Sequence, residues 1–544
     1  MNYIQEENVF YACGMPIMVA ENENGETHVY SSETGKQLSE SDLKFGKVFG
    51  GGKDCAVKNT SVVMKSGFLY LLAAGGQGGC VEETASVKLD GGMIGGYLYG
   101  GGIDDEIGNV NVEINGGAIK YGFFGCGNSL ECDNVNLVFS NILCTNVRTG
   151  SRNPNAVING KTNVVMTDGH ILDFVVGGGH KDEVSIEVHG GYIEKQIVKS
   201  FEGTLNLSIY ENIFMPNGVG ASFPMLPADV EVKYLPPVPR KQREDFVGDD
   251  SGFFDKSDDE GNLVFRFFEL RHPDVPRSVT PFPTPFVGDC FLIDFPDGRN
   301  MLVDTGSGYN MPEIKDGFER LGVERIDVLV ITHPHGDHMA NAKEIIENYD
   351  VQEIWIPDIN AQPSLEAEKA RLVEYYEILD EAKNKGKKVL PVADGDTFGF
   401  GGAEILVVNP VRTQEPAVDM NENSVAFKVT FKENSATLCG DISDKSEKRL
   451  SAKYGENLKT DFLKVAHHGI VYQSYYQFID FCNPKFGVVP SMRDDGVFLK
   501  TTKYSLEHVN GFDTDKLYIA GRYGKIKVVM NGNEKDIKII TQYK

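Results

Sequence analysis

Residues 48–200 alternate apolar and polar positions with a period of two, in short stretches separated by runs of glycine. Such alternation is typical of strands that bury one face and expose the other. No apolar spacing of three to four residues, which would indicate helices, interrupts the series. The pattern recurs as SVVMKSGFLYLLAAGG (61–76), VKLDGGMIGGYLYGGG (87–102), VNVEINGGAIKYGFFGCG (110–127), NVVMTDGHILDFVVGGGH (163–180) and VSIEVHGGYIEKQIV (184–198).

The glycines of this repeat give its period. Corresponding glycines stand at 67, 92, 117, 169 and 191, so the steps are 25, 25, 52 and 22 residues, and the longest step equals about two of the others. Strands that recur roughly every 20–30 residues between glycine corners predict a stacked parallel β-solenoid (β-helix), which we place at residues 1–214. A phosphate-binding loop is rejected, because the glycine runs lack a G-x-x-x-x-G-K-[ST] phrase and a following helix.

The pattern changes after residue 214. Prolines at 216, 224, 227, 236, 237 and 239, followed by an acidic stretch rich in Gly, Asp and Ser, predict a linker over residues 215–261. Over residues 262–544, stretches of strand character such as MLVDTG alternate with helical ones such as SLEAEKARLVEYYEILDEAKNKG. This alternation predicts an α/β sandwich whose strand-end loops carry the function.

Composition narrows the class of protein. The 544 residues exceed one core of ordinary size, and 36 of the 60 glycines lie in residues 1–240. The net charge of −26 provides no basic stripe for phosphates, so long nucleic acid is not expected as a partner. Nine scattered cysteines without a CxxC pair argue against a disulfide framework. Because neither a signal-like N-terminus nor a membrane-length apolar run is present, we expect a cytoplasmic protein without membrane contact.

The sharpest chemical signal is ITHPHGDHMAN (331–341), which lies between a predicted strand and a predicted helix. His333 and His335 are separated by one residue in an extended segment, so they project together and can share one metal ion. Asp337 and His338 stand at the helix start and can hold a second ion. Imidazole and carboxylate groups are suitable ligands for Zn²⁺, and also for Mn²⁺ or iron. A helix-capping role for Asp337 is compatible with this interpretation.

HPHGDH matches the HxHxDH signature of the metallo-β-lactamase superfamily, which the chain resembles over about residues 262–510. The resemblance implies an αββα sandwich. MLVDTG (301–306) matches the strand that ends in an Asp orienting ligand histidines, here Asp304. LCGDIS (438–443) matches the segment with a bridging carboxylate, here Asp441. LKVAHHG (463–469) matches the segment with the last histidine; we favour His468 as the ligand and His467 as a substrate contact, with the reverse assignment open.

The finer detail is similar to the hydrolase domain of the ComEC/Rec2 competence proteins and to phosphorylcholine-esterase-type enzymes, relatives that use two metals on phosphodiester or DNA substrates. GDCFLIDFPDGRNMLVDTG (288–306) and NENSVAFKVTF (421–431) carry this similarity, together with CGDIS and KVAHHG. The chain departs from many superfamily members because residues 339–466 contain no histidine. The resemblance therefore implies a first metal on His333, His335 and Asp441, completed by water or an unmatched residue, and a second on Asp337, His338, Asp441 and His468.

The resemblance implies two divalent metal ions, with zinc favoured and manganese as the alternative. Their bridging water would ionise near neutral pH, and Asp337 could accept its proton. Asn423 and Ser424 are candidate donors to the substrate, although plain turn and strand-start roles suit them at least as well. We expect hydrolysis of a phosphodiester, in a small phosphodiester, a nucleotide or a phosphorylated glycan.

Two rival functions stay open at the level of sequence. The same hydroxide can attack an acyl carbon, which would make the protein an ester, thioester or lactam hydrolase of the same fold. Alternatively, the solenoid is the working part and the metal domain is degenerate, although the intact set of ligands argues against this. The first half resembles glycine-rich β-helix repeats of bacterial proteins, whose long flat surface often contacts glycans or partners. A glycan or protein partner is therefore expected on the solenoid.

Overall fold

The computed structural model describes residues 3–195, 197–214, 248–270, 288–361, 366–412, 416–417, 419–469, 476–490, 497–533 and 536–543. The chain divides into two units, Met1–Lys241 with Gly496–Phe512, and Gln242–Asp495 with Asp513–Lys544. The predicted linker at 215–261 lies largely outside the described residues. Its described end contains the short helix α2 (Ser251–Phe254). The domain boundaries drawn from the sequence stay a prediction.

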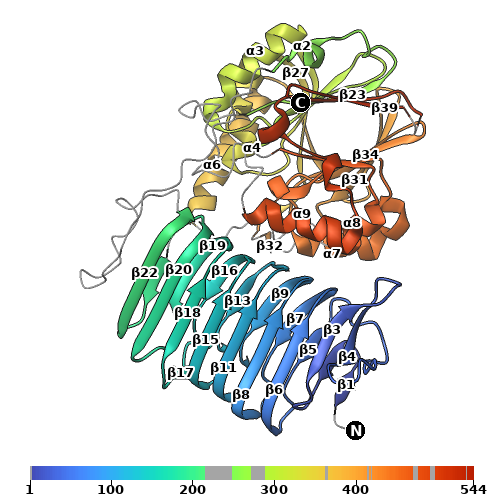
Figure 1. Cartoon of the computed structure of the whole chain (residues 1–544). Helices are drawn as coiled ribbons and strands as arrows, with labels where there is room; N and C mark the ends of the chain where they lie inside the picture. The colour runs from blue at the N-terminus through green and yellow to red at the C-terminus, as the bar shows by residue number, and fades with distance from the viewer. Residues whose placement is uncertain are drawn as a thin grey trace. The chain divides into compact units, whose positions relative to one another are not determined.

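Strands dominate the first unit, as the period-two alternation predicted (Figure 1). They form a sheet of 20 strands in which most pairs are parallel. One parallel series consists of β3 (Ile17–Glu21), β6 (Ala56–Met64), β8 (Cys80–Leu89), β11 (Glu106–Ile114), β15 (Glu131–Phe139), β18 (Thr162–Met166), β20 (Glu183–Ile193) and β22 (Thr204–Phe214). The other consists of β2 (Val9–Tyr11), β5 (Lys47–Phe49), β7 (Phe68–Ala73), β9 (Met93–Tyr99), β12 (Ala118–Ile119), β13 (Gly122–Phe124), β16 (Ile142–Arg148), β19 (Gly169–Gly177) and β21 (Ile197–Ser200).

The register of these strands repeats the period of the sequence. Ser61 pairs with Ser86, Ser86 with Asn111, and Asn111 with Asn136, so paired residues are 25 positions apart. The five glycines predicted at corners, at 67, 92, 117, 169 and 191, all have positive φ, between +79° and +139°. Glycine adopts this backbone region without steric cost, which explains why the repeat places it there.

Aliphatic side chains stack along the core of the first unit. Val62, Val87, Val112, Leu137 and Val164 occupy successive strands in register, and each is at most 3% exposed. They belong to one continuous hydrophobic cluster that runs through the sheet. Each strand therefore buries its apolar positions against the strands before and after it.

Helix α9 (Val497–Asn510) groups with the first unit, although the sequence placed it within the 262–544 domain. Its Lys500 Nζ lies 3.0 Å from His170 Nδ1 on β19, and Leu499 and Leu506 are buried. The spacing of apolar residues in this helix does not indicate which of the two units its buried face packs against.

Two sheets form the centre of the second unit. The eight-stranded sheet contains β29 (Lys388–Val392), β27 (Asp350–Pro357), β26 (Arg325–Val330), β25 (Asn300–Val303), β24 (Phe291–Asp294), β23 (Leu263–Phe267), β38 (Ile526–Met530) and β39 (Ile537–Thr541). The seven-stranded sheet contains β30 (Thr397–Phe400), β31 (Ala403–Asn409), β33 (Ala426–Phe431), β34 (Asn434–Leu438), β35 (Phe462–Lys464), β36 (Phe486–Val489) and β37 (Leu517–Ile519). One apolar cluster joins both sheets, with Phe265 and Val330 from the first and Phe427 and Val488 from the second.

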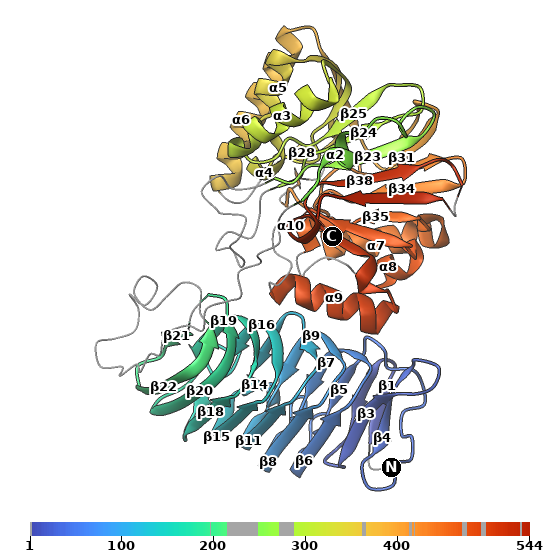
Figure 2. The ribbon, with the colours of Figure 1, turned by 45° about the horizontal axis from the view of Figure 1, so that its top comes forward.

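Helices cover the outer face of the eight-stranded sheet. A second apolar cluster joins Phe318, Ile345 and Tyr375 on the helices to Leu302 and Leu329 on the strands. Figure 2 shows helices α3 (Met311–Leu321), α5 (Ala342–Asn348) and α6 (Glu366–Asn384) grouped on that side of the sheet. The helices of this unit are α3 (Met311–Leu321), α4 (Gly336–Met339), α5 (Ala342–Asn348), α6 (Glu366–Asn384), α7 (Asp444–Tyr454), α8 (Tyr476–Cys482) and α10 (Ala520–Tyr523).

Two pairs of neighbouring parallel strands bring the predicted site residues to one place. Strands β25 and β26 are parallel neighbours in one sheet, and β34 and β35 are parallel neighbours in the other. The carboxyl ends of parallel neighbours meet at the same edge of a sheet, where loops carry function.

Among the described helices, none is both long and apolar enough to cross a membrane.

Candidate metal centre

Asp304 and the candidate metal ligands lie in the segments that follow these four strands. Asp304 comes after β25, and the loop with His333 and His335 comes after β26. Asp441 lies three residues beyond the end of β34, while His467 and His468 follow β35 in a short 3₁₀ turn. His333, His338, Asp441 and His468 are all at most 3% exposed. The site is thus assembled from strand ends of both sheets, as the sequence predicted.

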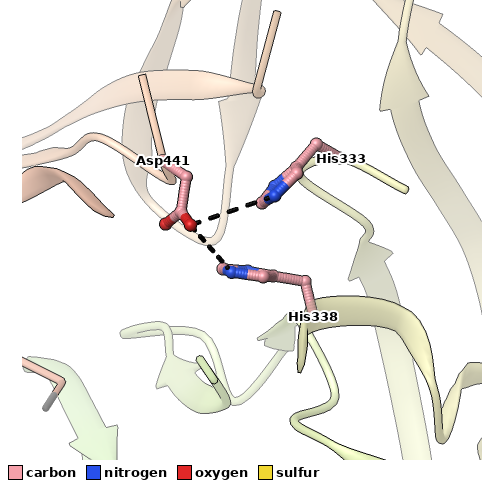
Figure 3. A group of neighbouring side chains, drawn as sticks. All are labelled: His333, His338 and Asp441. Carbon is pink, nitrogen blue, oxygen red and sulfur yellow. Dashed lines mark hydrogen bonds and ion pairs between the residues drawn. The ribbon is translucent and has the colours of Figure 1, made fainter. Parts of the chain in front are cut away.

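Four imidazoles face a single oxygen atom. Asp441 Oδ2 lies 3.1 Å from His338 Nε2, 3.3 Å from His468 Nε2, 3.6 Å from His467 Nε2 and 3.9 Å from His333 Nε2. Figure 3 shows His333, from the loop after β26, and His338, from helix α4, pointing toward the Asp441 carboxylate. This convergence places Asp441 at the centre of the cluster, and its role as a bridging carboxylate stays a prediction.

The remaining predicted ligands complete two groups around Asp441. His335 Nδ1 lies 2.9 Å from His333 Nε2. On the other side, Asp337 Oδ2 lies 3.5 Å from His468 Nε2 and 3.8 Å from His338 Nε2. We call His333 and His335 the first half of the site, and Asp337, His338 and His468 the second half; both adjoin Asp441.

The separations between these ligand atoms fit a metal ion. Ligand atoms about 2.1 Å from a tetrahedral zinc ion lie roughly 3.4 Å apart, and the distances above, from 2.9 to 3.9 Å, surround that value. The ligand atoms of His333, His338 and Asp441, and those of Asp337, His338 and His468, lie within 4.8 Å of one another. Among the described residues, the buried His335 Nε2 atom has no hydrogen-bond partner. Buried polar atoms without a partner are costly, which is consistent with an ion that stabilises the site.

Carboxylates hold the histidines of the second half from behind. Asp304 Oδ2 lies 2.8 Å from His338 Nδ1, and Asp304 also accepts hydrogen bonds from the backbone N–H and the hydroxyl of Thr332. His468 Nδ1 donates a hydrogen bond to the Pro490 backbone carbonyl at 3.0 Å and lies 3.2 Å from Asp289 Oδ1. Contact at Nδ1 leaves Nε2 directed to the centre, which is how outer carboxylates orient metal-binding histidines. The predicted orienting position of Asp304 therefore agrees with its contacts.

Sequence reasoning missed two buried charged residues of this site, Asp289 and Lys464. Both are fully buried and form an ion pair with each other. A usable signal was present, because Asp289 stands near the start of the apolar stretch GDCFLI and Lys464 stands within the apolar stretch FLKVA. Charged residues are almost never fully buried unless they are paired, so a charge beside a buried strand indicates a partner.

The backbone is strained where it turns side chains inward. Asp304, His467 and His468 have φ of +56°, +48° and +53° although none of them is glycine. Residues other than glycine adopt this left-handed region only when the surrounding structure enforces it, and they cluster at functional sites. Gly440, just before Asp441, has φ +51°. No sequence pattern predicted these conformations.

The two halves of the site differ in their electrostatics. Burial lowers the pKa of His335 to about 4 and, together with His338, lowers the pKa of His333 well below its usual value. Burial has the same tendency at His338, but Asp441, Asp337 and Asp304 outweigh it and raise the pKa of His338 well above its usual value. The first half is therefore neutral and the second half holds positive charge between carboxylates.

Burial and neighbouring charges also have opposing effects on the pKa of the central carboxylate. Burial alone would raise the pKa of Asp441, but His338, His468 and His467 lower it well below its usual value. A cation in place of the histidine protons would satisfy the same carboxylates. A metal ion that binds at the second half would thus displace protons from these histidines.

The structure places the predicted substrate contacts in two different settings. Ser424 is fully buried, and its hydroxyl accepts a hydrogen bond from the Asp441 backbone N–H at 3.2 Å. Asn423 donates from Nδ2 to the Asp419 carbonyl at 2.7 Å. His467 faces Asp441 through Nε2, and the assignment of His467 against His468 as the ligand stays a prediction, as does substrate contact by Asn423 and Ser424.

A two-sheet α/β sandwich with a histidine and carboxylate cluster at its strand ends has the form of a metal-dependent hydrolase domain. Residues 283–489 match the family model of the metallo-β-lactamase superfamily. The second half of the chain thus carries a metallo-β-lactamase superfamily domain, and the resemblance based on HPHGDH is confirmed. Members of this superfamily typically bind divalent metals, and the candidate ligand groups above are present.

Curated relatives agree with the branch that the sequence segments indicated. The chain is 25% identical over 175 residues to ComE operon protein 3 of Bacillus subtilis (strain 168), across 32% of this chain and 21% of that protein. It is 24% identical over 196 residues to competence protein ComA of Neisseria gonorrhoeae, across 36% of this chain and 24% of that protein. The matches thus span less than a quarter of the length of either relative. The ComEC-like resemblance is supported for this domain alone.

Among solved structures, the metallo-β-lactamase fold protein YhfI of Bacillus subtilis is similar at 14% identity and a TM-score of 0.30, across 47% of this chain and 96% of that one. Similarity at this level carries no information on the substrate.

Proposed function

We propose that this protein is a dinuclear metal-dependent hydrolase that acts on phosphodiester bonds. The observation that carries the proposal is the convergence of four imidazoles and a second carboxylate on Asp441, with separations of 3.1 to 3.9 Å from Asp441 Oδ2 to the four imidazole nitrogens. A shared carboxylate between two ligand groups is what a pair of metal ions requires. Zinc is the favoured metal and manganese the alternative, because the ligands are imidazole and carboxylate.

His333, His335 and Asp441 would hold the first ion, and Asp337, His338, Asp441 and His468 the second. Two bound ions would supply Lewis-acid chemistry, which polarises the scissile group and makes water nucleophilic near neutral pH. Asp337 is the most exposed of the carboxylates at this centre, with 31% of its side chain accessible. It is therefore placed to accept a proton from an attacking water, while the buried Asp304 keeps His338 oriented.

The substrate class rests on the resemblance to the ComEC/Rec2 branch, whose members use two metals on phosphodiester or DNA substrates. The net charge of −26 favours a small phosphodiester, a nucleotide or a phosphorylated glycan over a long polynucleotide, because an acidic surface repels extended phosphate chains. A cytoplasmic location is part of the same proposal.

The direct test measures metal content together with hydrolysis of bis-(p-nitrophenyl) phosphate and of an acyl ester, p-nitrophenyl acetate. We expect about two metal ions per chain and phosphodiesterase activity, and both should be lost in Asp441→Ala. His335→Ala should lose activity while keeping about one ion, because His335 contacts the first half alone. Two ions with acyl hydrolysis and no phosphodiesterase activity would move the proposal to an acyl substrate; absence of metal would overturn it.

We further propose that the first unit is a β-solenoid that binds a glycan or a protein partner. Two parallel series of strands, paired at 25-residue offsets and separated by positive-φ glycines, support this architecture. In a solenoid each coil contacts only its neighbours, so removal of one whole coil preserves the fold. Deletion of residues 61–85 in the full chain joins Thr60 to Ser86 in register and should leave a single cooperative unfolding transition for this unit. Deletion of 61–72, half a coil, should unfold it; equal damage from both deletions would contradict a solenoid.

A further inference from the structure

Lys464 lies at the end of β35 with no exposed surface. Its ammonium forms an ion pair with Asp289, donates a hydrogen bond to the Gly440 carbonyl at 2.8 Å, and lies 3.8 Å from Asp441 Oδ1. A lysine is almost never buried without partners, because desolvation of its charge is costly. The ammonium is therefore a fixed part of the cluster around Asp441.

The two oxygens of Asp441 have different surroundings. Oδ2 faces the four imidazoles, with His338 and His468 nearest, at 3.1 and 3.3 Å. Oδ1 faces Lys464 and has no hydrogen-bond partner among the described residues. A carboxylate that is free to rotate would offer either oxygen, or both, to a metal ion. The ammonium breaks this equivalence.

We propose that Lys464, held in place by Asp289, is a positioning residue that fixes Asp441 as a one-oxygen ligand. The ammonium retains Oδ1, so that only Oδ2 is available to both metal ions. This inference rests on the metal site of the proposed function and is independent of the substrate class.

Asp289 couples this arrangement to the second half of the site. Its Oδ2 pairs with Lys464, and its Oδ1 lies 3.2 Å from His468 Nδ1. One buried carboxylate thus contacts both the lysine beside Asp441 and an imidazole that faces Asp441, and the Pro490 carbonyl accepts a hydrogen bond from the Nδ1 of that imidazole. The Gly440 carbonyl adds a backbone connection, because it accepts hydrogen bonds from Lys464 Nζ and from the His467 backbone N–H at 3.0 Å.

The lysine also balances charge before a metal arrives. Asp289 and Asp441 are both buried, and like charges this close raise the free energy of the metal-free protein. The ammonium lies between them and reduces their repulsion. The metal-free site is thereby kept in the geometry that the ions require.

A charge-neutral double variant separates positioning from simple electrostatics. Removal of Lys464 alone deletes a positive charge, which by itself would tighten binding of a dication. Asp289→Asn with Lys464→Met removes one charge of each sign, so that effect cancels. The matched control is Asp294→Asn with Arg266→Met, which removes another buried ion pair of the same unit.

Zinc affinity is measured by competition with a chromophoric chelator, and the coordination of Co²⁺-loaded protein by its visible spectrum. We expect the Asp289/Lys464 double variant to bind zinc about 10–100-fold more weakly, the usual effect of losing an outer partner of a ligand, and to show a changed Co²⁺ spectrum as Asp441 binds through both oxygens. The Asp294/Arg266 control should match the parent in both readouts while losing thermal stability.

If the double variant does not fold, the isosteric single variant Asp289→Asn replaces it in both measurements. It leaves Asp441 as the nearest carboxylate for Lys464, so zinc affinity should again fall. Parent-like affinity and a parent-like Co²⁺ spectrum in these variants would overturn the inference and leave the proposed function intact. A parent protein without metal would overturn both.

Discussion

Asp105 in the first unit and Asp304 in the second are both almost completely buried, but their partners differ. Asp105, between β11 and the short strand β10 (Gly102–Ile103), is 1% exposed and accepts a hydrogen bond from the Gly76 N–H at 3.0 Å. Its other oxygen has no hydrogen-bond partner among the described residues. Asp304 is fully buried, and Thr332 and His338 contact both of its oxygens.

Burial raises the pKa of both carboxyls, to about 6 for Asp105, while His338 partly offsets the effect at Asp304. At Asp441 the surrounding imidazoles reverse the shift. Asp105 in the first unit therefore tends toward the neutral form, whereas the neighbouring imidazoles favour the charged form of Asp441. The same substitution, Asp to Asn, should accordingly have opposite consequences in the two units.

The larger effect of an Asp-to-Asn substitution is expected at Asp304, where it should lower zinc affinity and activity. In Asp304→Asn an amide N–H₂ replaces the oxygen that faces His338 Nδ1, so the imidazole loses the acceptor that directs its Nε2 to Asp441. We expect zinc affinity to fall about 10–100-fold, the usual cost of losing such an outer carboxylate, and activity to fall with it. Chelator competition and phosphodiester hydrolysis measure the two effects.

A matched control for Asp304→Asn is Asp327→Asn on β26. Asp327 pairs with the exposed Arg325 at 2.8 Å, at the opposite end of the strand from the site. This variant should keep parent affinity and activity. Unchanged zinc affinity in Asp304→Asn would show that the contact with His338 has only a structural role.

Part of the candidate ligand set could be named from the sequence because its spacing is local. His333, His335, Asp337 and His338 occupy six consecutive positions, and HxHxDH is specific to one superfamily. Asp441 and the His467–His468 pair needed the resemblance, since nothing in the chain alone joins residues a hundred positions apart. Asp289 and Lys464 escaped because a single buried charge gives no periodic signal, and their pairing arises only when the two sheets meet.

The repeat of the first unit was predicted from its glycines. One repeat was therefore not visible in the sequence, because it lacks the corner glycine. The 52-residue step between Gly117 and Gly169 was expected to hold two coils, and Ile142, which pairs with Gly169, stands where the missing corner glycine would be. A side chain at this corner removed the sequence signal without removing the strand. Helix α9 groups with the first unit although it is far from that unit in sequence, and an amphipathic pattern does not specify the unit against which an apolar face is buried.

The smaller effect is expected at Asp105, where the same substitution should raise the stability of the folded protein at neutral pH. In the folded protein its pKa is about 6, against a usual value of 3.8, so between these values the folded state binds more protons than the unfolded state. Stability from this group is full below pH 3.8 and is lost as the pH rises through about 6. At pH 7.5 the cost of the buried charge amounts to about 3 kcal/mol at most, since one pKa unit corresponds to about 1.4 kcal/mol.

Asp105→Asn removes this cost, because the amide keeps an oxygen for the Gly76 N–H and carries no charge. The variant should raise the unfolding temperature of the first unit at pH 7.5, and its advantage over the parent should shrink to nothing below pH 4. Thermal unfolding across this range, with hydrogen exchange at residues 75–106 to identify the transition, measures the effect. Asp133→Asn, at an exposed position on β15, should change neither value. Destabilisation by Asp105→Asn at pH 7.5 would mean that a cation, as at the metal centre, compensates this buried carboxylate and that the contrast between the two units is false.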